Sequence, residues 1–218
     1  MNNIKFAISS HIGSYKKTFE FICDDLIKSG INPSNIFFFI GGFKEYRKIE
    51  NNFFTNLYEV DHNSLDLGGI ISVIDLNIES EYWFLLHDTI SIGRNFAPAV
   101  SSKSYNTDTV SLTSDGLSMN MGAYSWSHLQ RNKEQIMLFK NTNYTLSGLQ
   151  EAKKKAVFYE DRFLHPKISF YNKTNRIVSE PIDFYENGTL RITEYFPDID
   201  LKKIKANWCE KESYELKL

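Results

Sequence analysis

The expected architecture of this chain follows from one segment, Glu81-Tyr-Trp-Phe-Leu-Leu-His-Asp-Thr-Ile-Ser-Ile-Gly93. Its apolar run, Tyr82 to Leu86, is rich in aromatic residues and ends abruptly at His87 and Asp88, which is typical of a buried strand. Open α/β sheets bind ligands in the crevice outside the carboxyl ends of their strands. Asp88 is therefore predicted either to face such a crevice or to cap the turn that follows the strand.

Strand-like and helix-like patterns alternate through the first half of the chain. Strands are predicted at Lys5–Ser9, Ile36–Ile40, Leu57–Val60 and Tyr82–Leu86, and helices at Tyr15–Ser29 and Leu67–Leu76. Such alternation is typical of βαβ units. Continuously apolar strands indicate a sheet that is covered on both faces. We therefore expect an α/β fold with a mainly parallel sheet flanked by helices.

The second half of the chain has a less regular pattern. Its predicted elements are a strand at Thr109–Thr113, a strand or tight loop at Leu117–Tyr124, a helix at Leu149–Phe163, and a short terminal helix at Leu201–Trp208. In addition, Asn187-Gly188 separates two β-rich runs, which is a signal for a small antiparallel hairpin. We see no interdomain linker, so residues 1–218 are expected to form a single domain.

Composition excludes several classes of protein. The 218 residues are 42% hydrophobic and carry a net charge of −2, without the basic block that nucleic-acid binding usually needs. No apolar stretch approaches the roughly 18 residues of a membrane span. The two cysteines, Cys23 and Cys209, are far apart in sequence, which argues against a disulfide framework or a zinc site. A reducing, cytoplasmic setting fits best.

Four polar loops carry the candidate chemistry. They span Ser9–His11, Asp61–Gly69, His87–Thr89 and Ser118–Gly122, and the first three follow predicted strands. Because the carboxyl ends of neighbouring parallel strands converge, these loops are expected to line one crevice.

This arrangement resembles the GT-A-fold glycosyltransferases, especially the family-2-like enzymes and their small viral relatives of the chlorovirus type. The resemblance covers the first ~125 residues, as a nucleotide-sugar-binding half, and leaves residues 126–218 as an acceptor-side half. It implies that Ser9, Ser10 and His11 hold the nucleotide base. It also implies that Asp66 and Gly68 precede a helix at the donor site, and that Asp88 ends an Asp-x-Asp motif that binds a divalent cation and the donor diphosphate.

The chain departs from the family pattern at that motif. Leu86 stands where the first Asp belongs, so Asp88 alone is retained, with His87 beside it. A cation can still bind, because Mg²⁺ and Mn²⁺ commonly use one or two protein ligands plus phosphate oxygens. His87 is either a further ligand or a side chain that packs inward and hydrogen-bonds the backbone.

The resemblance implies transfer of a hexose from a nucleotide-diphosphate sugar, with uridine diphosphate expected as the carrier, to a glycan or another hydroxyl acceptor. Asp161 of the pair Glu160-Asp161 and Asp115 are rival general bases. Asn120 and Gly122 are expected to approach the ligand, and Tyr124 and Trp126 are candidate platforms for a sugar ring.

Two other classes of function remain to be weighed. A non-catalytic module of the same fold that binds a nucleotide sugar or a glycan is an open alternative. An unrelated nucleotide enzyme is disfavoured, because neither Gly-x-Gly-x-x-Gly nor Gly-x-x-x-x-Gly-Lys is present. The chain is also compatible with one domain of a longer multi-domain transferase, and with the host cytoplasm if it is viral.

Overall fold

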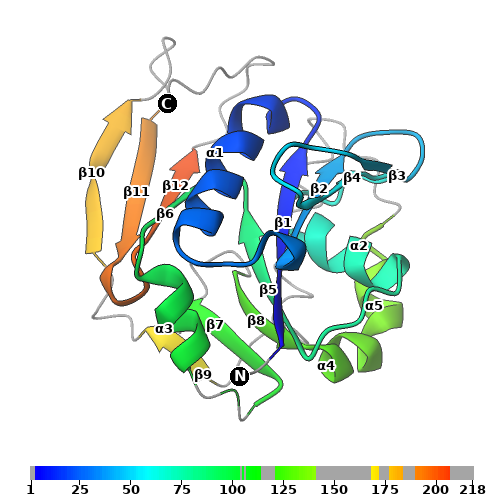
Figure 1. The fold of residues 1–218 in the computed structure, drawn as a ribbon. Helices are drawn as coiled ribbons and strands as arrows, with labels where there is room; N and C mark the ends of the chain where they lie inside the picture. Colours follow the sequence, from blue (N-terminus) through cyan, green and yellow to red (C-terminus); the bar gives the residue numbers. More distant parts are fainter. Residues whose placement is uncertain are drawn as a thin grey trace.

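A computed structural model of the chain describes residues 3–103, 105, 107–113, 121–140, 168–171, 177–183 and 190–206. The elements, shown in Figure 1, are β1 (Ile4–His11), α1 (Tyr15–Lys28), η1 (Pro33–Asn35), β2 (Ile36–Gly41), β3 (Arg47–Ile49), β4 (Asn56–Glu59), η2 (Leu65–Leu67), α2 (Gly68–Asp75), β5 (Tyr82–His87), β6 (Ile90–Ile92), α3 (Phe96–Ser102), β7 (Thr109–Thr113), β8 (Gly122–Ser125), α4 (Trp126–Arg131), α5 (Lys133–Met137), β9 (Ile168–Tyr171), β10 (Ile177–Asp183), β11 (Leu190–Phe196), η4 (Pro197–Ile199) and β12 (Leu201–Ala206).

The main sheet has a parallel centre and mixed margins, because β9 at one edge pairs in parallel with β7. Among the described residues its strand order is β3-β4-β2-β1-β5-β8-β7-β9. The four strands β4, β2, β1 and β5 are parallel to one another. By contrast, β3 runs antiparallel to β4, and β8 runs antiparallel to β5 and β7. The expected α/β class is confirmed, with a sheet that is mixed rather than parallel throughout.

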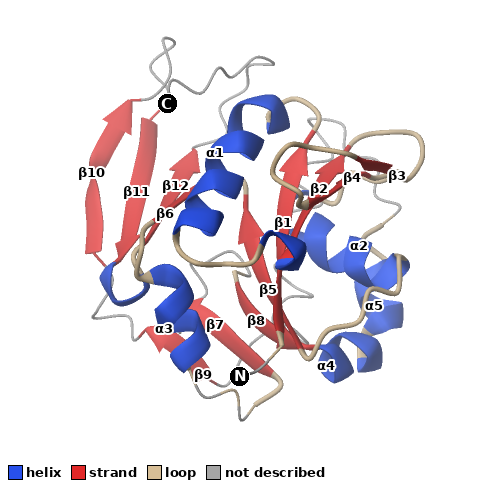
Figure 2. Ribbon diagram, in the orientation of Figure 1, coloured by secondary structure: helices blue, strands red, loops and turns tan. Residues whose placement is uncertain are grey.

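Helices cover both faces of this sheet (Figure 2). Side chains alternate along each strand, so that Phe6 and Phe84 face α1 and α3, whereas Ala7 and Leu85 face α2, α4 and α5. Every residue of β2 and of β5 is buried. Burial on both faces explains why these strands are continuous apolar runs in the sequence.

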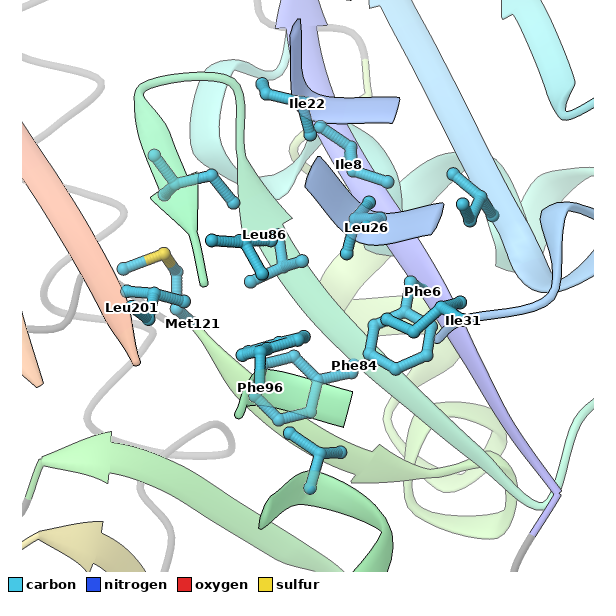
Figure 3. Close-up of a cluster of buried hydrophobic side chains, with 14 of the residues drawn as sticks. Phe6, Ile8, Ile22, Leu26, Ile31, Phe84, Leu86, Phe96, Met121 and Leu201 are labelled. Atoms are coloured by element: carbon cyan, nitrogen blue, oxygen red, sulfur yellow. The ribbon is translucent and has the colours of Figure 1, made fainter. Parts of the chain in front are cut away.

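Aromatic rings fill the core between the sheet and helices α1 and α3 (Figure 3). The ring of Phe84 lies 5.8 Å from that of Phe6 and 5.6 Å from that of Phe96, centroid to centroid. Such offset or edge-to-face pairs contribute about 0.5–1.5 kcal/mol beyond the area that they bury. Leu86 and Leu201 belong to the same cluster, so the end of β5 is anchored in the core.

A smaller antiparallel sheet packs beside the main one, in the order β10-β11-β12-β6. The antiparallel pairing of β10 with β11 agrees with the predicted hairpin. The predicted terminal helix at Leu201–Trp208 is wrong, because residues 201–206 form strand β12 between β11 and β6. Leu201 and Lys203 are buried while Lys202 is exposed, an alternation of period two that belongs to a strand.

Several predicted features lie outside the described residues, including the helix at Leu149–Phe163, Cys209 and the turn at Asn187-Gly188. The predicted helices at Tyr15–Ser29 and Leu67–Leu76 are confirmed as α1 and α2. In the part of the chain that is described, no helix has the length and apolar character required to cross a bilayer.

Candidate functional site

The strand order has a switch point between β1 and β5, which is where a ligand crevice is expected. From β1 the chain proceeds to β2 and then β4 on one side, and later returns to β5 on the other side of β1. Ligands of open α/β sheets bind at such a switch point, outside the carboxyl ends of the strands. Ser10 and His11 end β1, and His87 ends β5, so the predicted residues of both strands meet at this point.

Asp88 lies directly beyond β5, half-buried, and its backbone N–H extends the ladder by donating to the carbonyl oxygen of Ser9 over 3.1 Å. Its Oδ2 atom accepts hydrogen bonds from Ser10 Oγ at 2.7 Å, Ser14 Oγ at 2.8 Å and Thr18 Oγ1 at 3.4 Å. Ser14 and Thr18 belong to the amino-terminal turn of α1. The carboxylate therefore stabilises the positive end of that helix. One of its two oxygens, Oδ2, already accepts hydrogen bonds within the protein.

Ser9 holds the start of helix α2 against β1. Its buried hydroxyl donates to the carbonyl oxygen of Asp66 over 2.9 Å and accepts from the backbone N–H of Gly69 over 2.8 Å. These two bonds use the hydroxyl's proton and one of its two lone pairs within the protein, so Ser9 fixes Asp66 and Gly68 beside the carboxyl end of β1. Gly68 has open space beside it, because an added Cβ would come no closer than 3.9 Å to Ser9.

His87 is buried and lies at the centre of a polar cluster. Its Nδ1 atom is 2.7 Å from Nζ of Lys203 and 3.8 Å from Oδ1 of Asp66. The same lysine donates to Oγ1 of Thr89 over 2.8 Å. Of the two roles predicted for His87, the structure agrees with inward packing and hydrogen bonding, although its partner is a side chain rather than the backbone.

His11 ends β1 and lies beside the loop that follows β2. Its Nδ1 atom accepts from the backbone N–H of Gly13 over 3.0 Å, and a Cβ added to Gly42 would lie 3.3 Å from its Nε2 atom. Burial lowers the pKa of His11 below its usual value, against the opposing effect of the Asp88 carboxylate. The lowered pKa favours the neutral ring at pH 7.

The structure describes some of the remaining predicted site residues and not others. Gly122 begins β8 opposite Leu85, with a φ of 149°, close to the carboxyl end of β5. Tyr124 is 1% exposed and packs in the core, so it offers no platform to a sugar, whereas Trp126 is half-buried. Asn120 and both candidate bases, Asp115 and Asp161, lie outside the described residues.

The side chains that could ligate a metal ion here are few. They suit a cation that is also bound by a diphosphate better than a cation bound by the protein alone. Within the described residues, no group of three or more His, Cys, Asp and Glu side chains is placed to hold a metal ion. Asp88 can offer Oδ1, because its bonds to the three hydroxyls all use Oδ2. One carboxylate oxygen plus phosphate oxygens and waters is a common set for Mg²⁺.

Sequence reasoning missed three side chains of this region: Ser14, Thr18 and Lys203. Ser14 and Thr18 are four residues apart at the start of a predicted helix, and hydroxyls with this spacing lie on one helical face. That spacing was a usable signal. The sequence held no such signal for Lys203, because residues 201–208 were expected to be helical.

No protein-family model matches this sequence, and no curated protein is detectably similar to it. The functional argument therefore depends on the geometry of the crevice.

Proposed function

We propose that this chain is a GT-A-fold glycosyltransferase that takes a sugar from a nucleotide-diphosphate donor, with uridine diphosphate as the carrier, and passes it to a hydroxyl of a glycan. One observation carries the proposal. The residues that gather at the carboxyl ends of β1 and β5, where the strand order predicts a ligand site, are Ser10, His11, Asp66, His87 and Asp88.

In the proposed reaction the acceptor oxygen forms a bond to the anomeric carbon as the bond from that carbon to the diphosphate oxygen breaks. The acceptor proton goes to a carboxylate base, for which Asp161 and Asp115 remain the candidates. The diphosphate leaves with the bonding electron pair, so its negative charge must be stabilised. A divalent cation, Mn²⁺ or Mg²⁺, bound through Oδ1 of Asp88 would supply Lewis-acid stabilisation there.

The chain's own residues would orient the donor. His11 would stack on the base as a neutral ring, with the ribose or phosphate beside Asp66. Ser9 fixes this part of the crevice through its bonds to Asp66 and Gly69. Because these contacts use rigid strand and helix ends, the donor would meet a preorganised site.

A non-catalytic module that binds a nucleotide sugar or a glycan is the second candidate. The observation in its favour is that Oδ2 of Asp88 accepts hydrogen bonds from three protein hydroxyls. Only the other carboxylate oxygen, Oδ1, is then left to ligate a cation.

Turnover separates the two candidates. We expect slow release of nucleoside diphosphate from a donor sugar in the presence of Mn²⁺, and we expect Asp161→Asn to abolish it without loss of donor binding. If Asp115→Asn does so instead, the base assignment moves to Asp115. Tight donor binding without any release, with or without glycan acceptors, would identify a binding module.

A further inference from the structure

Asn63 is a half-buried asparagine in the loop after β4, and the protein itself does not use its carboxamide. Among the residues that the structure describes, none hydrogen-bonds the Asn63 side chain. Neither its nitrogen nor its oxygen is a buried atom without a partner, so both are open to solvent. A carboxamide has two N–H donors and an acceptor oxygen, and all of these are available to a molecule from outside.

The backbone on both sides of Asn63 is fixed by buried hydrogen bonds. His62 and Ser64 are each 4% exposed, and Nδ1 of His62 lies 3.0 Å from Oγ of Ser64. Nε2 of the same ring lies 3.1 Å from Oγ of Ser72 on α2, and the His62 carbonyl oxygen accepts from the N–H of Gly42 over 2.9 Å. An unpaired carboxamide on such a fixed backbone is preorganised, because little conformational entropy is lost when it binds a ligand.

The carboxamide lies beside the carboxyl end of β2, where two successive residues are glycines. A Cβ added to Gly41 would lie 3.5 Å from Oδ1 of Asn63 and 2.8 Å from the carbonyl oxygen of His62, so no side chain fits there. Gly42 is exposed, with a φ of 101°, and a Cβ on it would lie 3.0 Å from Cγ2 of Ile12. Because Ile12 is itself 44% exposed, an apolar side chain and a polar one flank the same glycine pair.

A flat ligand with an apolar face and a polar edge matches this combination of side chains. His11 pairs opposite Gly41 and precedes Ile12, and its lowered pKa favours the neutral ring. Nucleobases stack on such side chains through their faces and hydrogen-bond through edges on which donors and acceptors are neighbours. The carboxamide of an asparagine carries a donor beside an acceptor, so it makes two hydrogen bonds to one such edge.

The strand spacing suits a nucleotide that extends from Asn63 to Asp88. Strands β2 and β5 are the two neighbours of β1, so their carboxyl ends lie about 10 Å apart (Figure 1). A nucleoside diphosphate is long enough to have its base at β2 and its phosphates at β5.

We propose that Asn63 recognises the nucleobase of the donor: its carbonyl oxygen accepts from N3–H of uracil, and its amide donates to O4. The uracil ring packs against Ile12 and His11. This inference depends on the proposed function for the identity of the nucleotide. Ser9 and Ser10, which the resemblance places at the base, donate their hydroxyl protons within the protein, so neither can donate to O4.

The test is calorimetric titration of the full chain with uridine diphosphate and with its N3-methyl analogue, both in Mn²⁺. The methyl group removes the N3–H donor, so the analogue should bind the wild type about 10- to 100-fold more weakly. Asn63→Ala should weaken the binding of uridine diphosphate by a similar factor and should no longer distinguish the two ligands. Asn52→Ala is the matched control and should bind as the wild type does, because Asn52 is exposed in the loop before β4, at the opposite end of that strand.

Weaker binding and lost discrimination in Asn63→Ala, with Asn52→Ala unaffected, support the proposal. If Asn63→Ala does not fold, judged by circular dichroism, Asn63→Asp decides, since it keeps the shape of the side chain and loses the amide donor. Wild-type affinity in the Asn63 variant, unchanged discrimination, or no uridine diphosphate bound by the wild type overturns the proposal, and the glycosyltransferase function survives if any sugar nucleotide is turned over. Asn63-dependent binding without turnover of any uridine diphosphate sugar supports the base contact and overturns the glycosyltransferase function instead.

Discussion

Asp88 has one observed role and one proposed role, and a substitution series can separate them. Its Oδ2 atom joins β1, β5 and the start of α1 through Ser10, Ser14 and Thr18, whereas its Oδ1 atom is the oxygen proposed to meet a cation. The sequence predicted a crevice residue or a cap of the following turn; the capping is observed at another element, and the crevice role stays a prediction. The helix that it stabilises is α1, which precedes it in the chain, rather than the turn that follows.

We expect Asp88→Ala to lower the free energy of unfolding by about 1–3 kcal/mol, because three hydroxyls lose their acceptor. Asp88→Asn keeps an acceptor oxygen, so its loss should be smaller. Urea unfolding measures both. If Asn costs as much as Ala, the negative charge rather than the hydrogen bonding stabilises α1.

Gly69 and Gly68 are neighbours at the start of α2 with opposite surroundings. A Cβ at Gly69 would lie 3.0 Å from Cδ1 of Leu85 and 3.2 Å from both Cβ of Ala7 and Oγ of Ser9. We expect Gly69→Ala to lower the free energy of unfolding by about 1–3 kcal/mol through overpacking. The matched variant Gly68→Ala should change it by less than about 1 kcal/mol. Thermal unfolding of the pair checks this, and equal destabilisation would contradict the packing described.

At the scale of elements, the loop after β4 is joined to α2 through a buried histidine. The Nε2 atom of His62 lies 3.1 Å from Oγ of Ser72 on α2, and its Nδ1 atom lies 3.0 Å from Oγ of Ser64. Burial lowers the pKa of His62 to about 4, and Lys140 acts in the same direction. Asp61 and Asp75 oppose the shift. The loop that carries Asp66 is therefore packed around a neutral imidazole.

This packing makes stability depend on pH. His62 has a lower pKa folded than unfolded, so its contribution is complete above about 6.5 and is lost as pH falls toward about 4. The loss should amount to at most about 3 kcal/mol. Urea unfolding between pH 7 and pH 4 should show a flatter dependence for His62→Gln than for the wild type. Parallel curves would contradict this prediction.

The elements that sequence predicted well are those whose pattern and burial agree. Ile36–Ile40 and Tyr82–Leu86 are continuously apolar, and both are central strands buried on two faces. The helix predicted at Leu201–Trp208 is wrong, because the strand β12 at residues 201–206 depends on pairing with β6 and β11, which are distant in sequence. Contacts between segments distant in sequence also limited the prediction of the site. The residues at the ends of β1 and β5 were predictable, whereas the contact of Lys203 with His87 depends on the pairing of strands in the second sheet.

For the whole molecule, the switch point between β1 and β5 is the organising feature, and a donor bound there should stabilise the entire fold. Ligand at about 100 times its dissociation constant adds roughly 2.7 kcal/mol. For a chain of this length the melting temperature should rise by roughly 5–10 °C. A thermal-shift panel of uridine, thymidine and guanosine diphosphate sugars with Mn²⁺ measures this. Equal shifts from Mn²⁺ alone would show that the nucleotide contributes nothing.

The most direct test of the donor crevice is a crystal structure of the chain with a nucleotide-diphosphate sugar and Mn²⁺. We predict anomalous density for manganese next to Oδ1 of Asp88, with the diphosphate across the carboxyl ends of β1 and β5 and the base against His11. A nucleotide bound elsewhere, or a manganese site that does not include Asp88, would contradict the proposed donor site.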